Sequence, residues 1–319
     1  MTGISGQSGS YLAEFLLEKG YEVYGTLKRN SIAENQTARL NNTTYEKIKN
    51  GLQFADMTDV ASLMRVVNEV KPHEIYNLAA QSHVRVSFDQ PLYTLQATGL
   101  GVMNLLEVIR QICPEAKLYQ ASSSEMFGNS IDLDGYQRET TPMNPVSPYG
   151  CAKLLGYNLV KCYRESYGLF ASNGILFNHE SPRRGTNFVS NKVVIGAVKI
   201  SKGLQEELVL GNLDSSRDWG HAKDYVSAMW SMLQLDKPDD YVVATGKSHT
   251  VKELCDFVFA YLGMNYKDYV VTDEKYKRPL ELNDLKGDMT KFRNASNIKF
   301  EYDFETLLTE MIEYWKEQL

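Results

Sequence analysis

Glycine recurs at every third position of Thr2-Gly3-Ile4-Ser5-Gly6-Gln7-Ser8-Gly9, at the N-terminal end of the chain. An amphipathic stretch at residues 11–17 follows, Gly20 ends it, and residues 21–27 have the pattern of a strand. This order of glycine-rich turn, helix and strand is typical of the first unit of a dinucleotide-binding fold. The glycines there let the backbone approach a pyrophosphate at the N-terminus of the helix. The alternative is an ordinary glycine-rich turn.

One part of this unit is almost absent from the sequence. A strand should precede Gly3, yet few residues are available to form it. We expect either a chain that is trimmed at its N-terminus or a fold that has lost its first strand.

Strands and helices alternate along the first half of the chain, which predicts an α/β fold with a Rossmann-like, doubly wound parallel sheet. The predicted strands are 52–55, 74–78, 117–121 and 171–176, the predicted helices are 61–70, 99–112 and 147–167, and 32–51 is a predicted loop. After residue 176 the alternation breaks. The later predictions are helices 192–202, 221–235, 251–262 and 304–316, strand 241–244 and loop 211–220.

These later elements predict a smaller C-terminal lobe that binds a substrate. We expect a nucleotide-binding domain at 1–178 with 217–246, and the smaller lobe at 179–216 with 247–319.

The end of the second predicted strand indicates which dinucleotide is bound. An acidic residue there would bind the ribose hydroxyls of NAD. The sequence instead has Lys28-Arg29-Asn30-Ser31, and Arg29 can bind a ribose phosphate through two hydrogen bonds. This pattern favours NADP, and the alternative is a solvated basic turn. Asp56, at the end of the next strand, is expected either to contact the adenine edge or to cap a helix.

A tyrosine and a lysine are the candidate catalytic pair. Tyr149 and Lys153 are four residues apart on the predicted helix 147–167, so they share one face, and Ser147 is a possible N-cap. We expect the ammonium of Lys153 to lower the pKa of Tyr149 from about 10. Such a phenol can exchange a proton with a sugar hydroxyl near neutral pH. The same spacing occurs in other Tyr/Lys pairs of the chain, so a helix-surface contact is the alternative.

Two further polar residues follow the predicted strand 117–121. Ser123 and Glu125 would supply a hydrogen bond and a second acid or base. Residues at the carboxyl ends of parallel strands are where open α/β sheets bind ligands.

Composition excludes several classes of partner. The 319 residues carry a formal net charge of −6 without a basic block, which argues against nucleic acid. The four cysteines have no close pairing and the five histidines no metal-ligand spacing, so we expect reduced thiols, a cytoplasmic protein and no metal. No apolar run is expected to span a membrane, and the start lacks a signal-peptide pattern.

The glycine pattern, the Ser122-Ser123-Ser124-Glu125 cluster, the Tyr/Lys pair and the Asn178-His179 junction together resemble the extended short-chain dehydrogenase/reductase superfamily. More specific segments are similar to the GDP-mannose 4,6-dehydratase family, and they cover nearly the whole chain. These segments are Thr2–Leu12, Asn77–Phe88, Gly174–Gly185, Ser216–Tyr225 and Arg278–Glu281.

The resemblance implies bound NADP, a GDP-hexose substrate, and a homo-oligomer, dimer or tetramer, in which the Arg39 loop reaches a neighbouring cofactor site. The catalytic residues it implies are Ser123, Glu125, Tyr149 and Lys153. Those implied for the cofactor are Gly3, Gly6, Gln7, Gly9, Arg29, Asp56, Leu78, Ala80, Ser82, Tyr149, Lys153, His179 and Arg184. Those implied for the substrate are Ser82, Ser87, Asn178, Asn187, Lys192, Arg217, Arg278 and Glu281.

The implied reaction converts GDP-mannose to GDP-4-keto-6-deoxymannose. Tyr149 would take the proton of the carbon-4 hydroxyl while hydride passes to NADP. Glu125 would take the carbon-5 proton and help water leave carbon 6. The hydride would return to carbon 6, and carbon 5 would be reprotonated. The alternatives are a related GDP-hexose or GDP-heptose dehydratase, an epimerase or reductase of the superfamily, and a non-catalytic NADP-sensing protein. Glu125 favours a dehydratase, because epimerases and reductases do not need this acid.

The chain departs from the family pattern at three positions. Ser123 replaces the usual Thr and keeps the hydroxyl, Ser8 replaces an Asp of the glycine loop, and Asn191 replaces an Arg.

Overall fold

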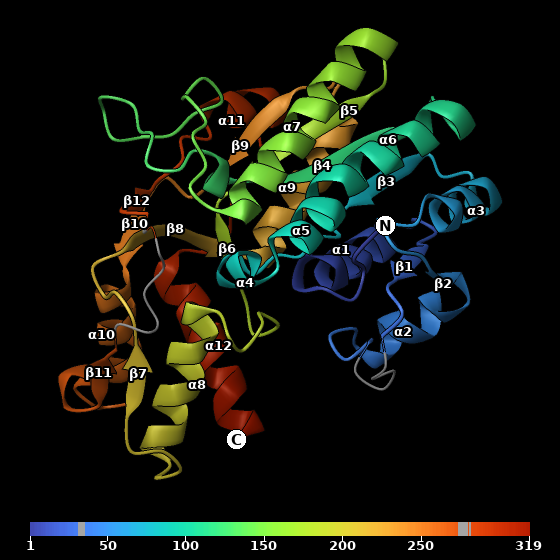
Figure 1. Cartoon of the computed structure of the whole chain (residues 1–319). Coiled ribbons are helices and arrows are strands. Elements are labelled where there is room, and N and C mark those ends of the chain that lie inside the picture. The colour runs from blue at the N-terminus through green and yellow to red at the C-terminus, as the bar shows by residue number, and fades with distance from the viewer. Residues whose placement is uncertain (31–35, 274–279, 281) are drawn as a thin grey trace.

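A parallel sheet forms the centre of the larger part of the computed structural model, which describes residues 1–30, 36–273, 280 and 282–319 (Figure 1). Strands β1 (Gly25–Leu27) and β2 (Leu52–Phe54) pair with each other, and a second group has the order β3-β4-β5-β9. The bounds of this group are Glu74–Asn77, Lys117–Ser123, Ala171–Leu176 and Asp240–Val243. Thr2 forms parallel bridges to Thr26 and to Asn77, so it joins the two groups into one sheet. The predicted α/β fold with a parallel sheet is confirmed.

Helices cover both faces of this sheet. Helices α1 (Gln7–Glu18) and α9 (Ala222–Gln234) pack together on one face, and α3 (Val60–Val70), α6 (Gly101–Ile112) and α7 (Pro148–Tyr167) cover the other (Figure 1). Successive strand residues alternate between the two cores, as the side-chain period of a strand requires. In β4, for example, Leu118 packs with the α3–α6 side and Tyr119 with the α1–α9 side.

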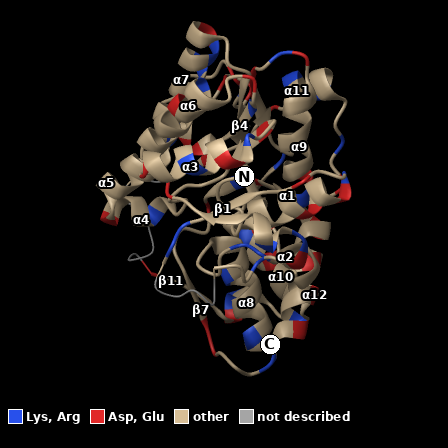
Figure 2. Ribbon diagram, turned by 90° about the vertical axis from the view of Figure 1, so that its right-hand side faces the viewer, with Lys and Arg blue, Asp and Glu red and all other residues tan. Residues whose placement is uncertain are grey.

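The C-terminal part of the chain has a separate hydrophobic core. Helices α8 (Val189–Ser201), α10 (Val251–Tyr261) and α12 (Phe304–Gln318) pack beside the two-stranded sheet β7 (Leu208–Leu210) and β11 (Val270–Thr272). Between this core and the large sheet lies a small sheet in which β8 (Ser216–His221) is central. Its neighbours are β6 (Asn178–Glu180), β10 (Ser248–Thr250) and β12 (Asp284–Leu285). Basic and acidic residues are interspersed along the ribbon in Figure 2.

Two predicted loops are regular structure instead. The segment 32–51 contains helix α2 (Asn42–Ile48) and a 3₁₀ turn at Lys49–Gly51, because the side chain of Asn41 accepts a hydrogen bond from the Thr44 amide and caps the helix. The segment 211–220 contains most of β8. These residues form a strand because they pair with β6, β10 and β12, and not because their own sequence alternates. The remaining short elements are α4 (Val84–Asp89), η4 (Ser124–Met126), η5 (Tyr266–Asp268) and α11 (Thr290–Ser296).

The helix predicted at 99–112 begins earlier than expected. α5 (Pro91–Thr94), a π-helix η3 (Leu95–Leu100) and α6 form one continuous helix, Pro91–Ile112. Contrary to the sequence expectation, this helix is long and apolar enough to cross a membrane by length and composition. It packs on α7, and 56% of its most apolar window is buried, which is the environment of a core helix.

A cavity of about 530 Å³ lies between β1 and β3, where Met1 and Thr2 reach its end. It is lined mainly by apolar side chains from α1, α3 and the two strands, and it contains none of the predicted site residues.

Candidate active site

Helix α7 brings Tyr149 and Lys153 to the carboxyl edge of the sheet. Ser147 caps the helix, since its side chain accepts a hydrogen bond from the Gly150 amide. Lys153 Nζ donates to the Ala121 carbonyl at 2.7 Å and lies 5.7 Å from the centre of the Tyr149 ring. Both side chains are buried, at 5% and 8% exposure, so the alternative of a solvated helix-surface pair is wrong.

The end of β4 places Ser123 and Glu125 against the same tyrosine. The Ser123 hydroxyl accepts a hydrogen bond from the Glu125 amide at 3.3 Å, which begins the turn η4. Ser123 also hydrogen-bonds the Tyr149 side chain, and the charge of Glu125 acts on that phenol. Ser123, Glu125 and Tyr149 therefore converge at one point, and all are at most 9% exposed.

The pKa of Tyr149 differs from the sequence expectation. Burial raises the pKa of this phenol to about 12, with a smaller contribution in the same direction from Glu125, while the Ser123 hydrogen bond and the charge of Arg184 oppose the rise. Lys153 was expected to lower the pKa, but its ammonium is directed to the Ala121 carbonyl. Burial also lowers the pKa of Lys153, to about 8.

The glycine loop is packed too closely for side chains. Gly3 has φ +66°, and a Cβ on Gly9 would lie 2.3 Å from the Gly3 carbonyl oxygen. Helix α1 has Gly6 as its N-cap, without a capping side chain and without an acidic residue in the first turn. Its first amides are thus left for a ligand, and together with the helix dipole they fit a pyrophosphate.

His179 is joined to this loop by two contacts. Gln7 Nε2 donates to the His179 carbonyl at 2.9 Å, and Ser8 Oγ lies 2.8 Å from His179 Nε2. Ser8 is the position where the family usually has Asp, and the serine hydroxyl suits the neutral ring. Burial, reinforced by the charge of Arg184, lowers the pKa of His179 to about 3.

Arg184 lies beside the same junction. Its Nε is 3.1 Å from the carboxylate of Glu180, and its guanidinium stacks over Phe188 at 3.7 Å. Asn191, where the family usually has Arg, donates to the Arg184 carbonyl and accepts from the Trp315 indole at 2.8 Å. The substitution therefore links this junction to the C-terminal helix.

The segment after β3 lines the same edge of the sheet. The amides of Leu78 and Ala79 both donate to the Thr2 hydroxyl at 3.1 Å, and the amide of Gln81 donates to Thr98. These bonds hold the chain that carries Leu78, Ala80 and exposed Ser82. Ser87 is buried, and its hydroxyl accepts a hydrogen bond from the Tyr149 amide.

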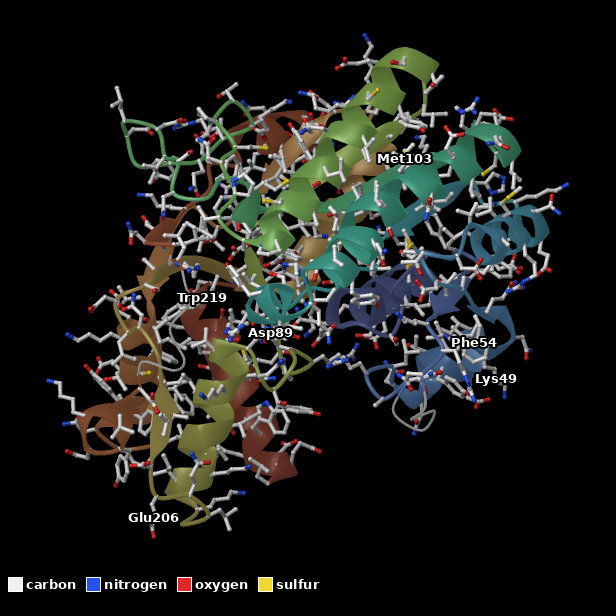
Figure 3. All side chains as sticks on the ribbon, in the orientation of Figure 1. Lys49, Phe54, Asp89, Met103, Glu206 and Trp219 are labelled. Carbon is white, nitrogen blue, oxygen red and sulfur yellow. The ribbon has the colours of Figure 1, made fainter. Side chains whose placement is uncertain are left out.

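Arg29 lies at the opposite end of the predicted cofactor site. It lines a cavity of about 280 Å³ together with Lys49, which the sequence reasoning missed because the segment was treated as a loop. Figure 3 shows Lys49 beside Phe54 at this end of the molecule. Lys28, by contrast, pairs with Asp56 at 3.1 Å. Asp56 does not cap α3, since Asp59 does.

The predicted substrate residues are placed less uniformly. Arg217 is 7% exposed and donates to the Leu282 carbonyl at 3.1 Å, and Lys192 Nζ donates to the Val209 carbonyl at 2.6 Å. Asn178 hydrogen-bonds the buried Glu180, whereas Asn187 is exposed. Arg278 and Glu281 lie outside the described residues.

The Arg39 loop lies next to Arg183, whose carbonyl accepts a hydrogen bond from Arg39 Nε at 2.9 Å. Arg39 is exposed on this surface.

Fold and site together define a Rossmann-type member of the short-chain dehydrogenase/reductase class. Solved structures similar to this chain include the Thermus thermophilus UDP-glucose 4-epimerase in complex with NAD, with 25% identity, TM-score 0.84, and coverage of 100% of this chain and 98% of that one. The Bacillus anthracis dTDP-glucose 4,6-dehydratase, also in complex with NAD, shares the fold at 22% identity and TM-score 0.82, covering 99% of this chain and 95% of that one.

The family model for GDP-mannose 4,6 dehydratase matches residues 1–311. The chain is 50% identical over 322 residues to GDP-mannose 4,6 dehydratase 2 of Arabidopsis thaliana, covering 98% of this chain and 85% of that protein. It is 47% identical over 336 residues to GDP-mannose 4,6 dehydratase of Homo sapiens, covering 98% and 89%. The chain therefore belongs to the GDP-mannose 4,6-dehydratase family, whose members are hydro-lyases, and the resemblance seen in its motifs is confirmed.

Proposed function

We propose that the protein converts GDP-mannose to GDP-4-keto-6-deoxymannose in the biosynthesis of deoxysugars. The observation that carries this proposal is the convergence of Ser123, Glu125 and Tyr149 at the carboxyl end of β4. Oxidation alone needs one acid–base group, whereas loss of water needs a second, and Glu125 is the second. Names of relatives at 47% and 50% identity support the choice of substrate.

Each catalytic side chain has a separate task. Bound NADP supplies a hydride acceptor at sugar carbon 4 and a hydride donor at carbon 6. Tyr149 takes the proton of the carbon-4 hydroxyl, and Ser123 hydrogen-bonds the same oxygen. Glu125 takes the carbon-5 proton and gives a proton to the hydroxyl that leaves carbon 6 as water, and carbon 5 is reprotonated when carbon 6 receives the hydride. Lys153 holds the cofactor side of the site.

The role of Tyr149 requires that its pKa fall from about 12 when the site is filled. Hydrogen bonding and nearby positive charge both lower the pKa of a phenol. Ser123 already supplies a hydrogen bond to the phenol, and Lys153 and Arg184 supply the nearby positive charge.

The preference for NADP is supported by the cavity at the ends of β1 and β2. Its described lining carries two cations, Arg29 and Lys49, and no carboxylate. A ribose phosphate would be attracted to this pair, and the arginine fork suits its oxygens. Lys49 adds less to this attraction than Arg29, because its ammonium is ion-paired with Glu46.

Further assignments complete the proposal. Residues 1–178 with 217–246 form the NADP-binding domain, and 179–216 with 247–319 form the substrate lobe. The GDP-sugar is bound by Asn187 and Lys192 of the lobe together with Asn178 and Arg217 at the boundary of the NADP-binding domain. The enzyme works in the cytoplasm as a homo-oligomer, a dimer or tetramer, in which the exposed Arg39 approaches a neighbouring cofactor site.

The test is incubation of purified protein with GDP-mannose and catalytic NADP, followed by mass spectrometry of the nucleotide sugar. A product that has lost one water supports the proposal. An unchanged mass with a changed sugar configuration would identify an epimerase. In a parallel incubation with stoichiometric NADPH, a gain of two hydrogens without loss of water would identify a reductase. Either result would overturn the proposed reaction.

A further inference from the structure

The loop between Glu125 and Tyr149 is fastened to the chain that supports Arg217. We propose that Arg138, through Asp288, is a positioning residue that holds β12 and thereby places Arg217 for the nucleotide sugar. This inference rests on the proposed function, since it assumes that Arg217 binds the substrate. The loop, residues 128–146, is called the clamp loop below.

The clamp loop lies between two catalytic residues: it starts three residues after Glu125 and ends three residues before Tyr149. Glu125 lies in the turn η4 just before it, and Ser147, the N-cap of α7, comes directly after it and before Tyr149. The two ends of the loop meet at Gly128, where a Cβ would lie 1.9 Å from the Asn144 carbonyl oxygen. The base of the loop is therefore held beside the catalytic groups.

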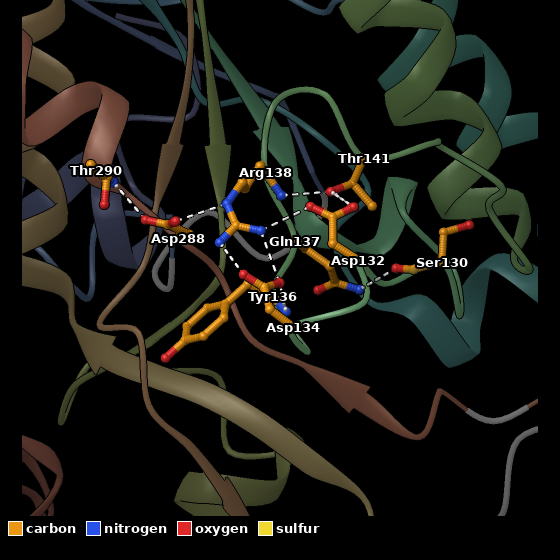
Figure 4. Close-up of polar contacts among 9 residues, drawn as sticks. All are labelled: Ser130, Asp132, Asp134, Tyr136, Gln137, Arg138, Thr141, Asp288 and Thr290. Carbon is orange, nitrogen blue, oxygen red and sulfur yellow. Dashed lines mark hydrogen bonds and ion pairs between the residues drawn. The ribbon is translucent and has the colours of Figure 1, made fainter.

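Arg138 binds three carboxylates at once (Figure 4). Its Nη1 contacts Asp132 at 3.0 Å, its Nη2 contacts Asp134 at 2.6 Å, and its Nε contacts Asp288 at 2.8 Å. Asp132 and Asp134 belong to the clamp loop, so these two pairs shape the loop itself. Asp288 lies three residues after β12, so this pair crosses to another part of the chain.

The neighbouring residue repeats the connection through the backbone. The Gln137 amide donates to the Lys286 carbonyl at 2.9 Å, and the Asp288 amide donates to the Gln137 carbonyl at 3.0 Å. Gln137 is fully buried, and its side chain accepts from the Lys286 amide. Short parallel pairing thus fixes the register of Gly287 against the clamp loop.

Strand β12 connects the clamp loop to Arg217. β12 pairs in parallel with β8, with Leu285 opposite Arg217, and the Arg217 guanidinium donates to the Leu282 carbonyl. On the next residue of β8, the buried carboxylate of Asp218 accepts from the Gly287 amide at 3.4 Å. The chain 282–288 is therefore held between the clamp loop on one side and β8 on the other.

The position of Arg217 relative to Glu125 and Tyr149 then depends on the contact between the clamp loop and residues 282–288, to which the Arg138–Asp288 pair adds the ionic part. A change in β12 moves the nucleotide-binding side without touching the reacting groups. Such a change should therefore raise the KM for the nucleotide sugar while kcat changes little.

Asp134 and Asp288 provide a matched comparison, because both bind Arg138 but only Asp288 crosses to β12. We expect Asp288→Asn and Arg138→Met to raise the KM for GDP-mannose about three- to tenfold with kcat within about twofold, a size typical of coupling through packed elements. Asp134→Asn should leave both constants near wild type. Arg138→Lys should restore part of the affinity, since lysine reaches one carboxylate but lacks the fork.

Calorimetric titration with GDP checks the binding step directly, and thermal unfolding identifies variants that are merely unstable. Weaker GDP binding in Asp288→Asn but not in Asp134→Asn supports the positioning role. Equal effects of the two aspartate variants, or an unchanged KM in folded Arg138→Met, would overturn it. If wild type neither binds GDP nor dehydrates GDP-mannose, the proposed function fails instead, so the two failures are distinguishable.

Discussion

The catalytic group and the cavity at the ends of β1 and β2 differ in how firmly the fold holds them. Ser123, Glu125, Tyr149 and Lys153 are 5–9% exposed and lie on β4, η4 and α7, each with a contact that fixes it. Arg29 is exposed, and its cavity is bounded by a short helix and a segment that includes residues 36 and 37. Proton transfer needs fixed geometry, whereas attraction of a phosphate tolerates a mobile charge. The difference predicts large losses of rate in the first region and selective losses of affinity in the second.

The largest effect is expected for Tyr149→Phe. Loss of the hydroxyl removes the proton acceptor but keeps the packing of the ring, so kcat should fall by about 10³ to 10⁴. The affinity for GDP-mannose, measured by calorimetry, should stay within about threefold of wild type because the ring is retained. A variant with wild-type turnover would show that Tyr149 has only a structural role and that the buried group is not the site of proton transfer.

Glu125→Gln should affect dehydration more than oxidation. The amide has the size of the carboxylate but cannot cycle a proton, so release of the dehydrated product should fall by about 10² to 10³. Absorbance of reduced nucleotide on the enzyme, together with product mass, separates the two steps. Rapid formation of dehydrated product by this variant would mean that another group is the second base.

Arg29→Ala should weaken NADP about ten- to a hundredfold and NAD much less, since the lost contact is with the ribose phosphate. Lys28→Ala is the matched control, because Lys28 is paired with Asp56 and bonded to the Tyr93 hydroxyl. The measurement is fluorescence titration with both cofactors. Equal losses for NADP and NAD, or a larger loss in Lys28→Ala, would contradict the assignment.

The smallest effect is expected in the acid stability of His179→Gln. Burial lowers the pKa of His179 to about 3, whereas an unfolded chain has its ordinary value near 6.5. Between these values the unfolded chain binds a proton that the folded chain does not, so the unfolding free energy falls as pH falls. The variant lacks this contribution, and its unfolding temperature should drop less between pH 7 and pH 5. Identical slopes for both proteins would argue against a buried neutral imidazole.

Sequence reasoning succeeded where regular elements carry the site. The glycine turn and α1, the strand that ends at Ser123, and the capped helix that carries Tyr149 and Lys153 all follow from periodicity and capping signals. Their motifs also gave the family, which the comparisons confirmed. The assignment of each residue to cofactor or substrate stays a prediction.

The errors have three causes. β8 was treated as a loop because its residues form a strand only through pairing with β6, β10 and β12, which are distant in sequence. The pKa of Tyr149 was misjudged because burial outweighs a lysine whose ammonium is bonded elsewhere, and burial is a property of the folded chain. Lys49 was missed for a smaller reason, since the Asn41 cap of α2 was present in the sequence but not recognised.

The π-helix η3 makes part of the site depend on the length of the chain as well as on residue identity. A π turn holds one residue more than an α turn, and Thr98 within it reaches the Gln81 amide at 3.0 Å. Deleting a single residue there would restore ordinary α-helical winding, because the wide turn holds the extra residue. The helix on either side would keep nearly the same rotation, so the change would fall on Thr98, whose hydroxyl holds the Gln81 amide in the segment that carries Ala80 and Ser82. In this chain, an insertion or deletion at this turn is therefore expected to disturb the site more than most substitutions on the same helix.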